Sequence, residues 1–351
     1  MSRPIVLITG ASGHIGGWLT ETLCLTGRVD VRPGIRKWSS GARLGRLPVE
    51  VVLCDVLDRE QIIRALHGVD HVVHCAADGT EVIVRGTENM LDLSLRAGVT
   101  RFVHLSTTEV YGDCSGVVYE TEPYRKTGSP YGDSKVKAEQ LCWRYYRRGL
   151  PVSMLRPSIV YGPFGRAWTV DMAHKLGSGN WGAFKGCGDG ICNLVYVADL
   201  VSAILLVLNS KRAIGEAFNI VGPETVTWNE YFQRFADAMG LGILPAMDPT
   251  GCKIRSSFVG PAKVLAKSIL GLLGDPIQAL YDQSSEARAA MRWLERKIRT
   301  TPTLKDLALY DRRARYATTK AREMLDYTPQ VDVESGLRIS VKWLEHQGLL
   351  L

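Results

Sequence analysis

A tyrosine and a lysine four residues apart are the residues in this sequence best suited to moving a proton. Tyr131 and Lys135 belong to the segment YGDSK, and on a helix this spacing places both side chains on one face. A phenol has a pKa near 10 and is a poor base at neutral pH. A neighbouring ammonium group favours the phenolate and lowers that pKa. The pair therefore predicts proton exchange with a substrate hydroxyl or carbonyl.

A run of hydroxyl side chains precedes this pair. The segment STTEVYG, residues 106–112, follows the apolar run Arg101–Ser106, which predicts a buried strand. Active sites of open parallel sheets lie outside the carboxyl ends of the strands. A hydroxyl there can hydrogen-bond the reacting oxygen, and we expect Thr107 to supply it.

A glycine-rich turn near the amino terminus predicts a dinucleotide site. The segment TGASGHIG, residues 9–16, directly follows the apolar run Ile5–Thr9 and opens a helical pattern from about Ile15 to Leu25. Glycines at such positions permit a tight turn and a close approach to a pyrophosphate, and the helix start offers free N–H groups. The expected cofactor contacts in this turn are Gly10, Ser12, Gly13, His14, Ile15 and Gly16.

The end of the second expected strand, Val29–Ile35, bears on the choice of dinucleotide. An acid there would accept from the adenosine ribose and repel a 2′-phosphate. The chain instead has Arg36 and Lys37, which favour NADP over NAD, unless they are only solvated cations. Asp55 follows the third expected strand, where it can accept from the adenine amino group. The other residues expected beside the cofactor are Val56, Cys75, Ala76 and Ala77.

The elements that must position these groups alternate between strand and helix. The helix 130–148 is the clearest, with Ser129 as a suitable N-cap, Pro130 at its first position and Gly149 at its end. The alternation predicts an α/β fold, a Rossmann-like doubly wound parallel sheet. The other expected strands are 49–54, 69–76 and 152–156, and the other helices are 59–66 and 82–97.

The second half of the chain predicts a smaller, mainly helical substrate lobe. We expect a dinucleotide-binding domain over residues 1–164, to which about 190–222 return, and a substrate-binding lobe over most of 165–351. Residues from about 240 to 310 are expected to be mainly helical, with an amphipathic stretch at Val264–Leu273. The other elements expected here are helices 199–208, 228–239, 320–325 and 334–346 and the strand 217–221.

The composition is that of an ordinary globular protein, with 351 residues, of which 46% are hydrophobic and 23% charged. The formal net charge of +7 fits either a solvated basic surface or attraction for anionic ligands. Basic residues concentrate somewhat over 253–322, but without the interleaved aromatics typical of nucleic-acid binding.

No apolar run is long enough for stable membrane insertion. Eight scattered cysteines without metal-ligand spacing predict a reduced, cytoplasmic protein and no metal.

Taken together, these motifs resemble the extended short-chain dehydrogenase/reductase family, especially its NAD(P)-dependent epimerase/dehydratase branch. Beyond the segments above, the resemblance rests on HCAA (74–77), GTENML (86–91), LRPSIVYGP (155–163), NLVYVADL (193–200) and ATTKAREMLDYTP (317–329). It implies that Thr107, Tyr131 and Lys135 form a catalytic triad and that Lys135 also binds the nicotinamide ribose. It further implies that Pro157 and Ser158 lie near the nicotinamide. A homodimer through the helices at about 82–97 and 130–148 is implied as well.

Four positions bear on the substrate that the resemblance implies. The segment STTEVYG is similar to that of sugar-nucleotide dehydratases and decarboxylases, in which the residue matching Glu109 works on the sugar. The dehydratases carry Asp where this chain has Thr108. The branch often holds a diphosphate with Asn and Arg where this chain has Ser158 and Cys192. Glu109 therefore has either a catalytic or a structural role at the rim of the site.

Three functions remain open from the sequence. The first is an oxidoreductase or epimerase acting at a hydroxyl or carbonyl carbon of a sugar or nucleotide-sugar, supported by Glu109 and the closing segment. The second is an NADP-dependent reductase or dehydrogenase of a non-nucleotide carbonyl or alcohol, sterol-like or another natural product. The absence of the diphosphate anchors and the pair Arg36 and Lys37 support it. The third is a dinucleotide-sensing protein without catalysis, which Thr107, Tyr131 and Lys135 argue against.

Overall fold

The computed structural model describes residues 3–248, 251 and 300–350, which form two compact units. The first unit comprises residues 1–165, 193–224 and 314–332, and the second comprises 166–192, 225–313 and 333–351. Residues 314–332 belong to the first unit, although the sequence assigned most of 165–351 to the substrate lobe. They return because β15 (Ala314–Tyr316) pairs with β6 (Gly116–Val118), and because the Tyr327 hydroxyl donates to the Val221 carbonyl at 3.1 Å.

The first unit is built on a seven-stranded sheet with the order β12-β7-β5-β4-β1-β2-β3. All its pairings are parallel. The strand order reverses at β1, which lies between β2 and β4, and this is where such sheets bind ligands. The strands are β1 (Ile5–Thr9), β2 (Asp30–Ile35), β3 (Val52–Leu53), β4 (His71–His74), β5 (Arg101–Leu105), β7 (Val152–Pro157) and β12 (Ala217–Ile220). The expected Rossmann-like parallel sheet is confirmed.

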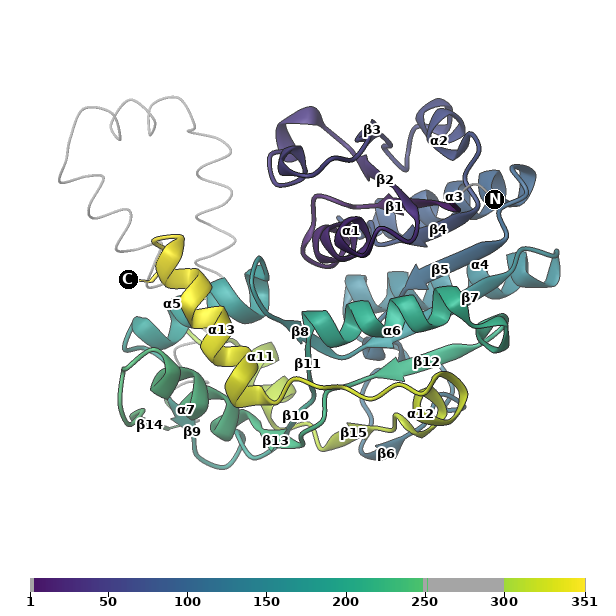
Figure 1. Ribbon diagram of the computed structural model, residues 1–351. Coiled ribbons are helices and arrows are strands. Elements are labelled where there is room, and N and C mark those ends of the chain that lie inside the picture. The colour runs from purple at the N-terminus through teal and green to yellow at the C-terminus, as the bar shows by residue number, and fades with distance from the viewer. Residues whose placement is uncertain (1–2, 249–250, 252–299, 351) are drawn as a thin grey trace, which may run out of the picture. The chain divides into compact units, whose positions relative to one another are not determined.

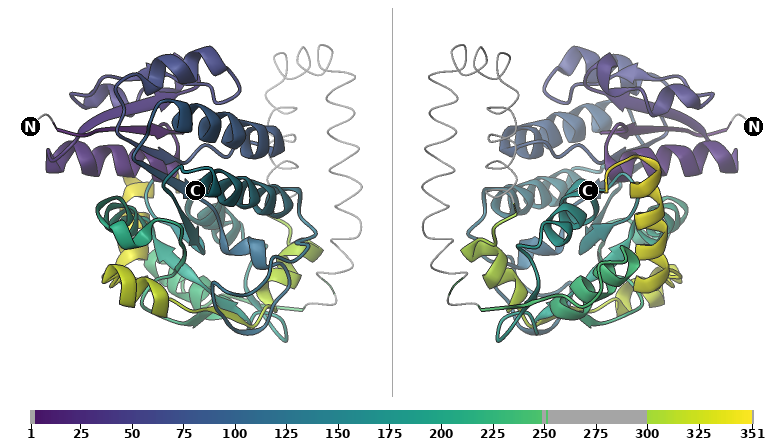
Figure 2. Two further views of the ribbon diagram at one scale, coloured as in Figure 1. Left: turned by 90° about the vertical axis from the view of Figure 1, so that its right-hand side faces the viewer. Right: turned by 90° about the vertical axis from the view of Figure 1, so that its left-hand side faces the viewer.

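Helices cover both faces of this sheet. In Figure 1, α1 (His14–Thr26) and α6 (Val197–Asn209) lie on the face toward the viewer. The helices α3 (Thr87–Arg96) and α4 (Pro130–Arg147) lie behind the sheet, and the side views separate the two layers (Figure 2). The shorter α2 (Arg59–Leu66) packs beside α3. Both faces of the strands are therefore buried, as in other sheets of this type.

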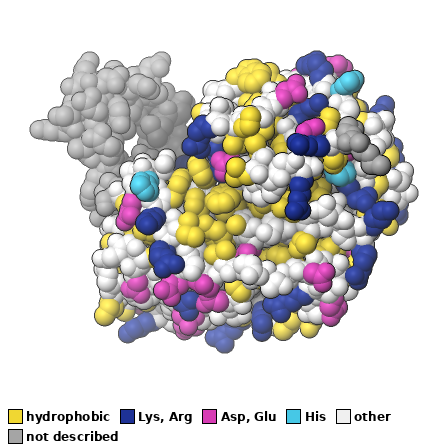
Figure 3. Space-filling model, viewed as in Figure 1, with side chains coloured by type: hydrophobic (Ala, Val, Ile, Leu, Met, Phe, Trp, Pro, Cys, Tyr) yellow, Lys and Arg dark blue, Asp and Glu magenta, His cyan; other side chains and the backbone are white. Residues whose placement is uncertain are grey.

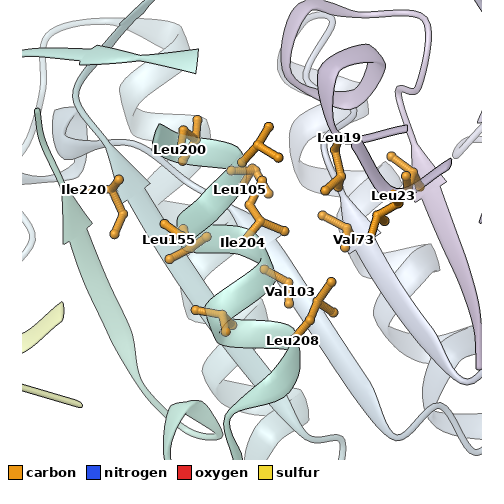
Figure 4. Packing of buried hydrophobic residues seen from close by; sticks show 14 of the residues in the cluster. Leu19, Leu23, Val73, Val103, Leu105, Leu155, Leu200, Ile204, Leu208 and Ile220 are labelled. Carbon is orange, nitrogen blue, oxygen red and sulfur yellow. The ribbon is translucent and has the colours of Figure 1, made fainter. Parts of the chain in front are cut away.

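The core divides into two clusters because successive residues of a strand point to opposite faces. Val103, Leu105 and Leu155 belong to the cluster under α1 and α6, whereas Phe102 and Met154 belong to the cluster under α2, α3 and α4. Figure 4 shows the first cluster, in which leucine and isoleucine side chains of α6 lie against the sheet next to those of α1. The residues drawn there from the two helices include Leu19, Leu23, Leu200, Ile204 and Leu208.

The helix that carries the candidate catalytic pair begins and ends as its sequence predicts. The Ser129 hydroxyl accepts from the Gly132 N–H, and Pro130 is the first helical residue. Gly149 then turns the chain with φ of +100°. Two other elements differ from expectation. The strand expected over 49–54 is reduced to Val52–Leu53, and the helix expected from 82 begins with the π-helical turn η3 (Val82–Gly86).

The described residues of the second unit form helices and short strands around an aromatic core. Its described helices are α5 (Asp171–Gly177), α7 (Trp228–Ala238), α11 (Leu304–Tyr310) and α13 (Val333–His346). The strands β9 (Ala183–Phe184) and β14 (Ala246–Met247) form one short pair, and β10 (Ile191–Cys192) and β13 (Val226–Thr227) form another. The core rings Trp181, Phe184, Trp228, Phe232 and Tyr310 are all fully buried. The amphipathic stretch at 264–273 and most of the basic region at 253–322 lie outside the described residues.

On the face shown in Figure 3, Lys and Arg side chains are interspersed with acidic and apolar ones. No helix within the described residues is long and apolar enough to cross a membrane. The cysteines among these residues have free thiols, and several of them are buried.

Candidate active site

The glycine turn has the geometry of a binding site for a dinucleotide. Gly10 has φ of +66°, and a Cβ there would lie 3.0 Å from the Ala76 nitrogen in the loop after β4. A Cβ on Gly16 would collide with the Gly10 carbonyl, so α1 starts directly against the turn. No side chain among the described residues caps α1 at Gly13, and its first turn has no acid. The free N–H groups favour an anion, so these residues fit the expected pyrophosphate.

The side chains of the turn add no charge. Burial and the nearby Arg43 lower the pKa of His14 to about 4, so this imidazole is neutral at pH 7. Ile15 is half-buried against the cluster under α1. Ser12 is half-buried and available to the turn. The turn therefore offers backbone N–H groups rather than side-chain cations of its own to an anion.

The loops after β2, β3 and β4 meet around the place expected for the adenosine. Arg36 Nη1 donates to Asp78 Oδ2 at 2.9 Å, between the loops after β2 and β4, and both side chains are exposed. Lys37 is also exposed. Asp55 is half-buried, and its Oδ1 accepts from the Leu57 N–H at 3.0 Å. The sequence reasoning missed Asp78, because nothing local indicates that it reaches Arg36.

The residues expected beside the cofactor after β3 and β4 differ in burial. The Cys75 N–H donates to the Thr9 carbonyl at 3.3 Å, which holds the loop beside the glycine turn. Burial raises the pKa of the Cys75 thiol to about 12, so it is protonated and uncharged at neutral pH. Val56 is buried against Gly86, while Ala77 is exposed.

Thr107, Glu109 and Tyr131 come together beyond the carboxyl end of β5. Thr107 caps the short helix η4 (Thr108–Tyr111), and its Oγ1 accepts from the Glu109 N–H at 3.2 Å. Burial and the Glu109 carboxylate raise the pKa of Tyr131 to about 12, against the effect of a hydrogen bond with the Thr107 side chain. Tyr131 is therefore a neutral phenol at pH 7 in this state, ready to give a proton.

Lys135 is buried beneath this group. Its Nζ donates to the Leu105 carbonyl at 2.5 Å and lies 6.0 Å from the centre of the Tyr131 ring. Burial lowers the pKa of Lys135 to about 8. From the sequence we expect Lys135 to lower the pKa of Tyr131. In the structure, burial and the Glu109 carboxylate raise that pKa, and the Lys135 ammonium donates to the Leu105 carbonyl.

The same spacing of tyrosine and lysine recurs at Tyr316 and Lys320 without this arrangement. Tyr316 ends β15, whereas Lys320 lies in α12 (Thr319–Leu325) and pairs with Glu216 at 2.6 Å. The four-residue spacing alone therefore does not select a site. The site is indicated by two further features, the helix capped by Ser129 and the strand that ends before Thr107.

The two residues expected near the nicotinamide end β7. Pro157 is its last residue, and the Ser158 N–H donates to the Ile220 carbonyl at 3.1 Å. The Ser158 hydroxyl is buried and has no hydrogen-bond partner within the described residues. Cys192 is fully buried and its thiol has a raised pKa, so that position offers no positive charge.

One sizeable pocket of the first unit lies away from these residues. It has a volume of about 500 Å³ and is lined by apolar groups of α1 and α6, among them Leu23 and Leu205. It also includes Val6 and His71 at the amino-terminal ends of β1 and β4. It is therefore at the opposite edge of the sheet from Tyr131.

Comparison with known proteins decides the family. Residues 6–221 match the model of the NAD dependent epimerase/dehydratase family. The chain belongs to this family. Its members are NAD-dependent enzymes of the oxidoreductase type, and this chain is one of them. The third function considered above, a protein without catalysis, is set aside.

Relatives of known name include enzymes of two substrate classes. The chain is 32% identical over 255 residues to sterol demethylase protein B of Methylococcus capsulatus, covering 67% of this chain and 74% of that protein. It is 31% identical over 261 residues to a dTDP-glucose 4,6-dehydratase of Streptomyces antibioticus, covering 68% and 78%. A 3beta-hydroxysteroid-dehydrogenase/decarboxylase of Arabidopsis thaliana is 24% identical over 91% of this chain, but only 56% of that longer protein is spanned.

Solved structures support the fold. A UDP-glucose 4-epimerase from Thermotoga maritima superposes with a TM-score of 0.72 at 23% identity, covering 98% of this chain and 99% of that one. A UDP-glucuronic acid 4-epimerase from Bacillus cereus, solved with NAD, gives 0.71 at 20% identity, covering 97% and 96%. At these identities the likeness establishes the architecture alone.

Proposed function

We propose that this enzyme transfers hydride at a hydroxyl or carbonyl carbon of a sugar or nucleotide-sugar, with Tyr131 as the acid-base residue. The observation that carries the proposal is the meeting of Thr107, Glu109 and Tyr131 at one strand end, with Lys135 below them. The bound nicotinamide would supply or accept the hydride. Tyr131 would give its proton to the substrate oxygen on reduction and take it back on oxidation, and Thr107 would hydrogen-bond the same oxygen.

Glu109 supports a sugar-modifying reaction without full dehydration. Its carboxylate is near enough to the Tyr131 hydroxyl to raise the pKa of that phenol. Thr108, where the dehydratases have Asp, is buried and carries no acid. We therefore propose epimerase-like or net oxidoreductase chemistry, in which Glu109 contacts a second substrate hydroxyl.

A second candidate is an NADP-dependent reductase or dehydrogenase of a non-nucleotide alcohol or carbonyl, including a sterol-like one. The observation that favours it is the absence of a diphosphate-binding side chain at two positions, Ser158 and Cys192, where the branch often has Asn and Arg. Cys192 is fully buried, and Ser158 offers only a buried hydroxyl. The similarity to a sterol demethylase protein at 32% identity adds support.

For the cofactor we propose NADP, or NAD as the alternative. Arg36 at the end of β2 is a cation where NAD-specific sheets of this type carry an acid. Purified protein should be denatured and the released dinucleotide identified. Tightly held NAD would contradict the proposed preference and favour an internal redox cycle. An empty protein that binds NADPH more tightly than NADH would support it and favour net reduction.

We further propose a homodimer through α3 and α4 in the reduced environment of the cytoplasm. The free thiols of the described cysteines fit such a compartment.

The decisive assay offers UDP- and dTDP-hexoses and a 3β-hydroxysterol to the protein with NAD or NADP. Reduced dinucleotide is followed by absorbance, and the products are separated by chromatography and identified by NMR, because an epimer has the same mass as its substrate. Tyr131→Phe should lower kcat by about 10²- to 10⁴-fold, the range for one acid-base group, and leave dinucleotide affinity nearly unchanged. Retained turnover in this variant would remove Tyr131 from the mechanism. Turnover of the sterol alone would replace the first candidate with the second.

A further inference from the structure

A buried carboxylate follows the candidate catalytic lysine on the same helix. Glu139 lies one turn after Lys135 in α4 and is 0% exposed. Burying a carboxylate is costly unless it is paired and hydrogen-bonded. No step of the proposed chemistry uses this group, and no motif in the sequence singled it out.

Four hydrogen-bond donors surround the Glu139 carboxylate. Its Oε1 accepts from the Ser106 hydroxyl and, at 3.0 Å, from Arg156 Nε. Its Oε2 accepts from Arg156 Nη2 at 2.6 Å and from the Tyr124 hydroxyl at 2.7 Å. The charge is therefore fully compensated within the first unit.

The donors come from the segments that carry the candidate site. Ser106 immediately precedes Thr107 at the end of β5, and Arg156 immediately precedes Pro157 in the neighbouring strand β7. Arg156 also donates to the Tyr111 hydroxyl at 2.7 Å, at the end of η4. One carboxylate on the helix of Tyr131 thus joins the ends of two adjacent strands.

A second bond from the same helix fixes the residue before Ser106. Lys135 Nζ donates to the Leu105 carbonyl at 2.5 Å. Helix α4 therefore holds two consecutive residues of the chain just before Thr107. The link at Ser106 is the nearer of the two to Thr107, so its loss should shift the Thr107 side chain relative to the Tyr131 hydroxyl.

We propose that Glu139 is a positioning residue, which holds Thr107 at the Tyr131 hydroxyl by binding Ser106, directly after β5, and Arg156 on β7. The inference rests on the proposed function only in that Tyr131 is the acid-base residue. It differs from a purely structural role, in which the buried ion pair would stabilise the fold and leave the acid-base group unaffected.

The variant that separates the two roles is Ser106→Ala. It removes the link to β5 and leaves the Glu139–Arg156 ion pair in place. A matched control exists in Ser153→Ala on β7, where a buried serine donates to the Ala213 carbonyl at 2.7 Å, away from α4. Each variant removes one buried hydroxyl and one hydrogen bond. Both should lower the melting temperature by a few degrees, and Ser106→Ala by more, because its partner is a charged carboxylate.

The first measurement needs no substrate. Crystal structures of the full-length Ser106→Ala and Ser153→Ala variants are compared with that of the wild type. In Ser106→Ala the Thr107 side chain should be displaced from the Tyr131 hydroxyl, because the bond that ties the end of β5 to α4 is lost. In Ser153→Ala the Thr107 side chain should keep its wild-type position.

The second measurement uses whichever substrate the wild type turns over in the assay above. Ser106→Ala should lower kcat about fivefold to tenfold, with the KM for the dinucleotide within about twofold, as expected when one hydrogen bond in the transition state is lost. An unmoved Thr107 in Ser106→Ala, together with equal kcat in Ser106→Ala and Ser153→Ala, would overturn the inference. Failure of the proposed function looks different, because Tyr131→Phe would then retain turnover.

Discussion

The buried Lys135 differs in charge state between the folded and the unfolded chain at alkaline pH. Burial lowers its pKa to about 8, against about 10.4 for an unfolded lysine. Between these pH values the unfolded chain binds a proton that the folded chain does not, so stability rises with pH across this window. Below about pH 8 both states carry the proton, and burial of the ammonium costs on the order of 3 kcal/mol.

Replacing this lysine should remove that pH dependence. We expect Lys135→Met to unfold at higher urea concentration than the wild type at about pH 7, with the advantage shrinking by up to about 3 kcal/mol toward about pH 10.5. Lys137→Met, on the same helix but exposed, is the matched control and should follow the wild type at both pH values. Parallel curves for all three proteins would show that Lys135 carries no burial cost.

The residues of the site could be predicted to different extents. Thr107, Tyr131 and the glycine turn follow from spacing along the chain, since a strand end, a helix start and a tight turn are local features. Asp78 and Glu139 could not be found this way. Their partners, Arg36 and Arg156, are distant in sequence and reach them only through the sheet.

At the scale of elements, the loops after β2 and β4 are joined by the exposed pair of Arg36 and Asp78. A 2′-phosphate at the end of β2 would use Arg36 and be repelled by Asp78. We expect Asp78→Asn to tighten NADPH binding by about twofold to fivefold, the usual range for an exposed pair, and to leave NADH binding unchanged. Both dissociation constants are measurable by fluorescence titration.

A charge-matched control tests whether this effect is specific. Glu81→Gln removes another exposed carboxylate nearby in sequence, one that pairs with Arg85 instead. It should change neither affinity. If both variants tighten NADPH equally, general electrostatics accounts for the change, and if neither does, Asp78 does not compete for Arg36.

The bounds of helices and strands were predicted best where capping residues, proline or glycine mark their ends in the sequence. The helix α4 follows from Ser129, Pro130 and Gly149, and α1 ends at Gly27 with φ of +61°. The short β3 did not follow from its apolar sequence. Its neighbour β2 contains Pro33, which has no N–H to give, and only Gly34 and Ile35 pair with β3. Pairing partners decide strand length, and they are not visible along the chain.

At the scale of the whole molecule, the sequence only partly predicted which segments of the chain belong to which of the two units. The first half repeats strand and helix, which predicts a parallel sheet by itself. Residues 314–332 return to that sheet's unit through contacts of β15 and Tyr327 with residues far away in sequence. The alternation of strand and helix stops long before this segment, so no periodic pattern indicated its return.

The expected homodimer is a property of the outer faces of α3 and α4. Glu88 of α3 pairs with Arg144 of α4, and both are about half-exposed. A two-fold interface uses the same face of both copies, so a change there acts twice. We expect light scattering to give twice the chain mass of 38.7 kDa for the wild type and a single chain mass for Arg144→Glu. Arg64→Glu makes the same charge change on α2 and should remain dimeric, whereas a monomeric wild type would refute this assembly.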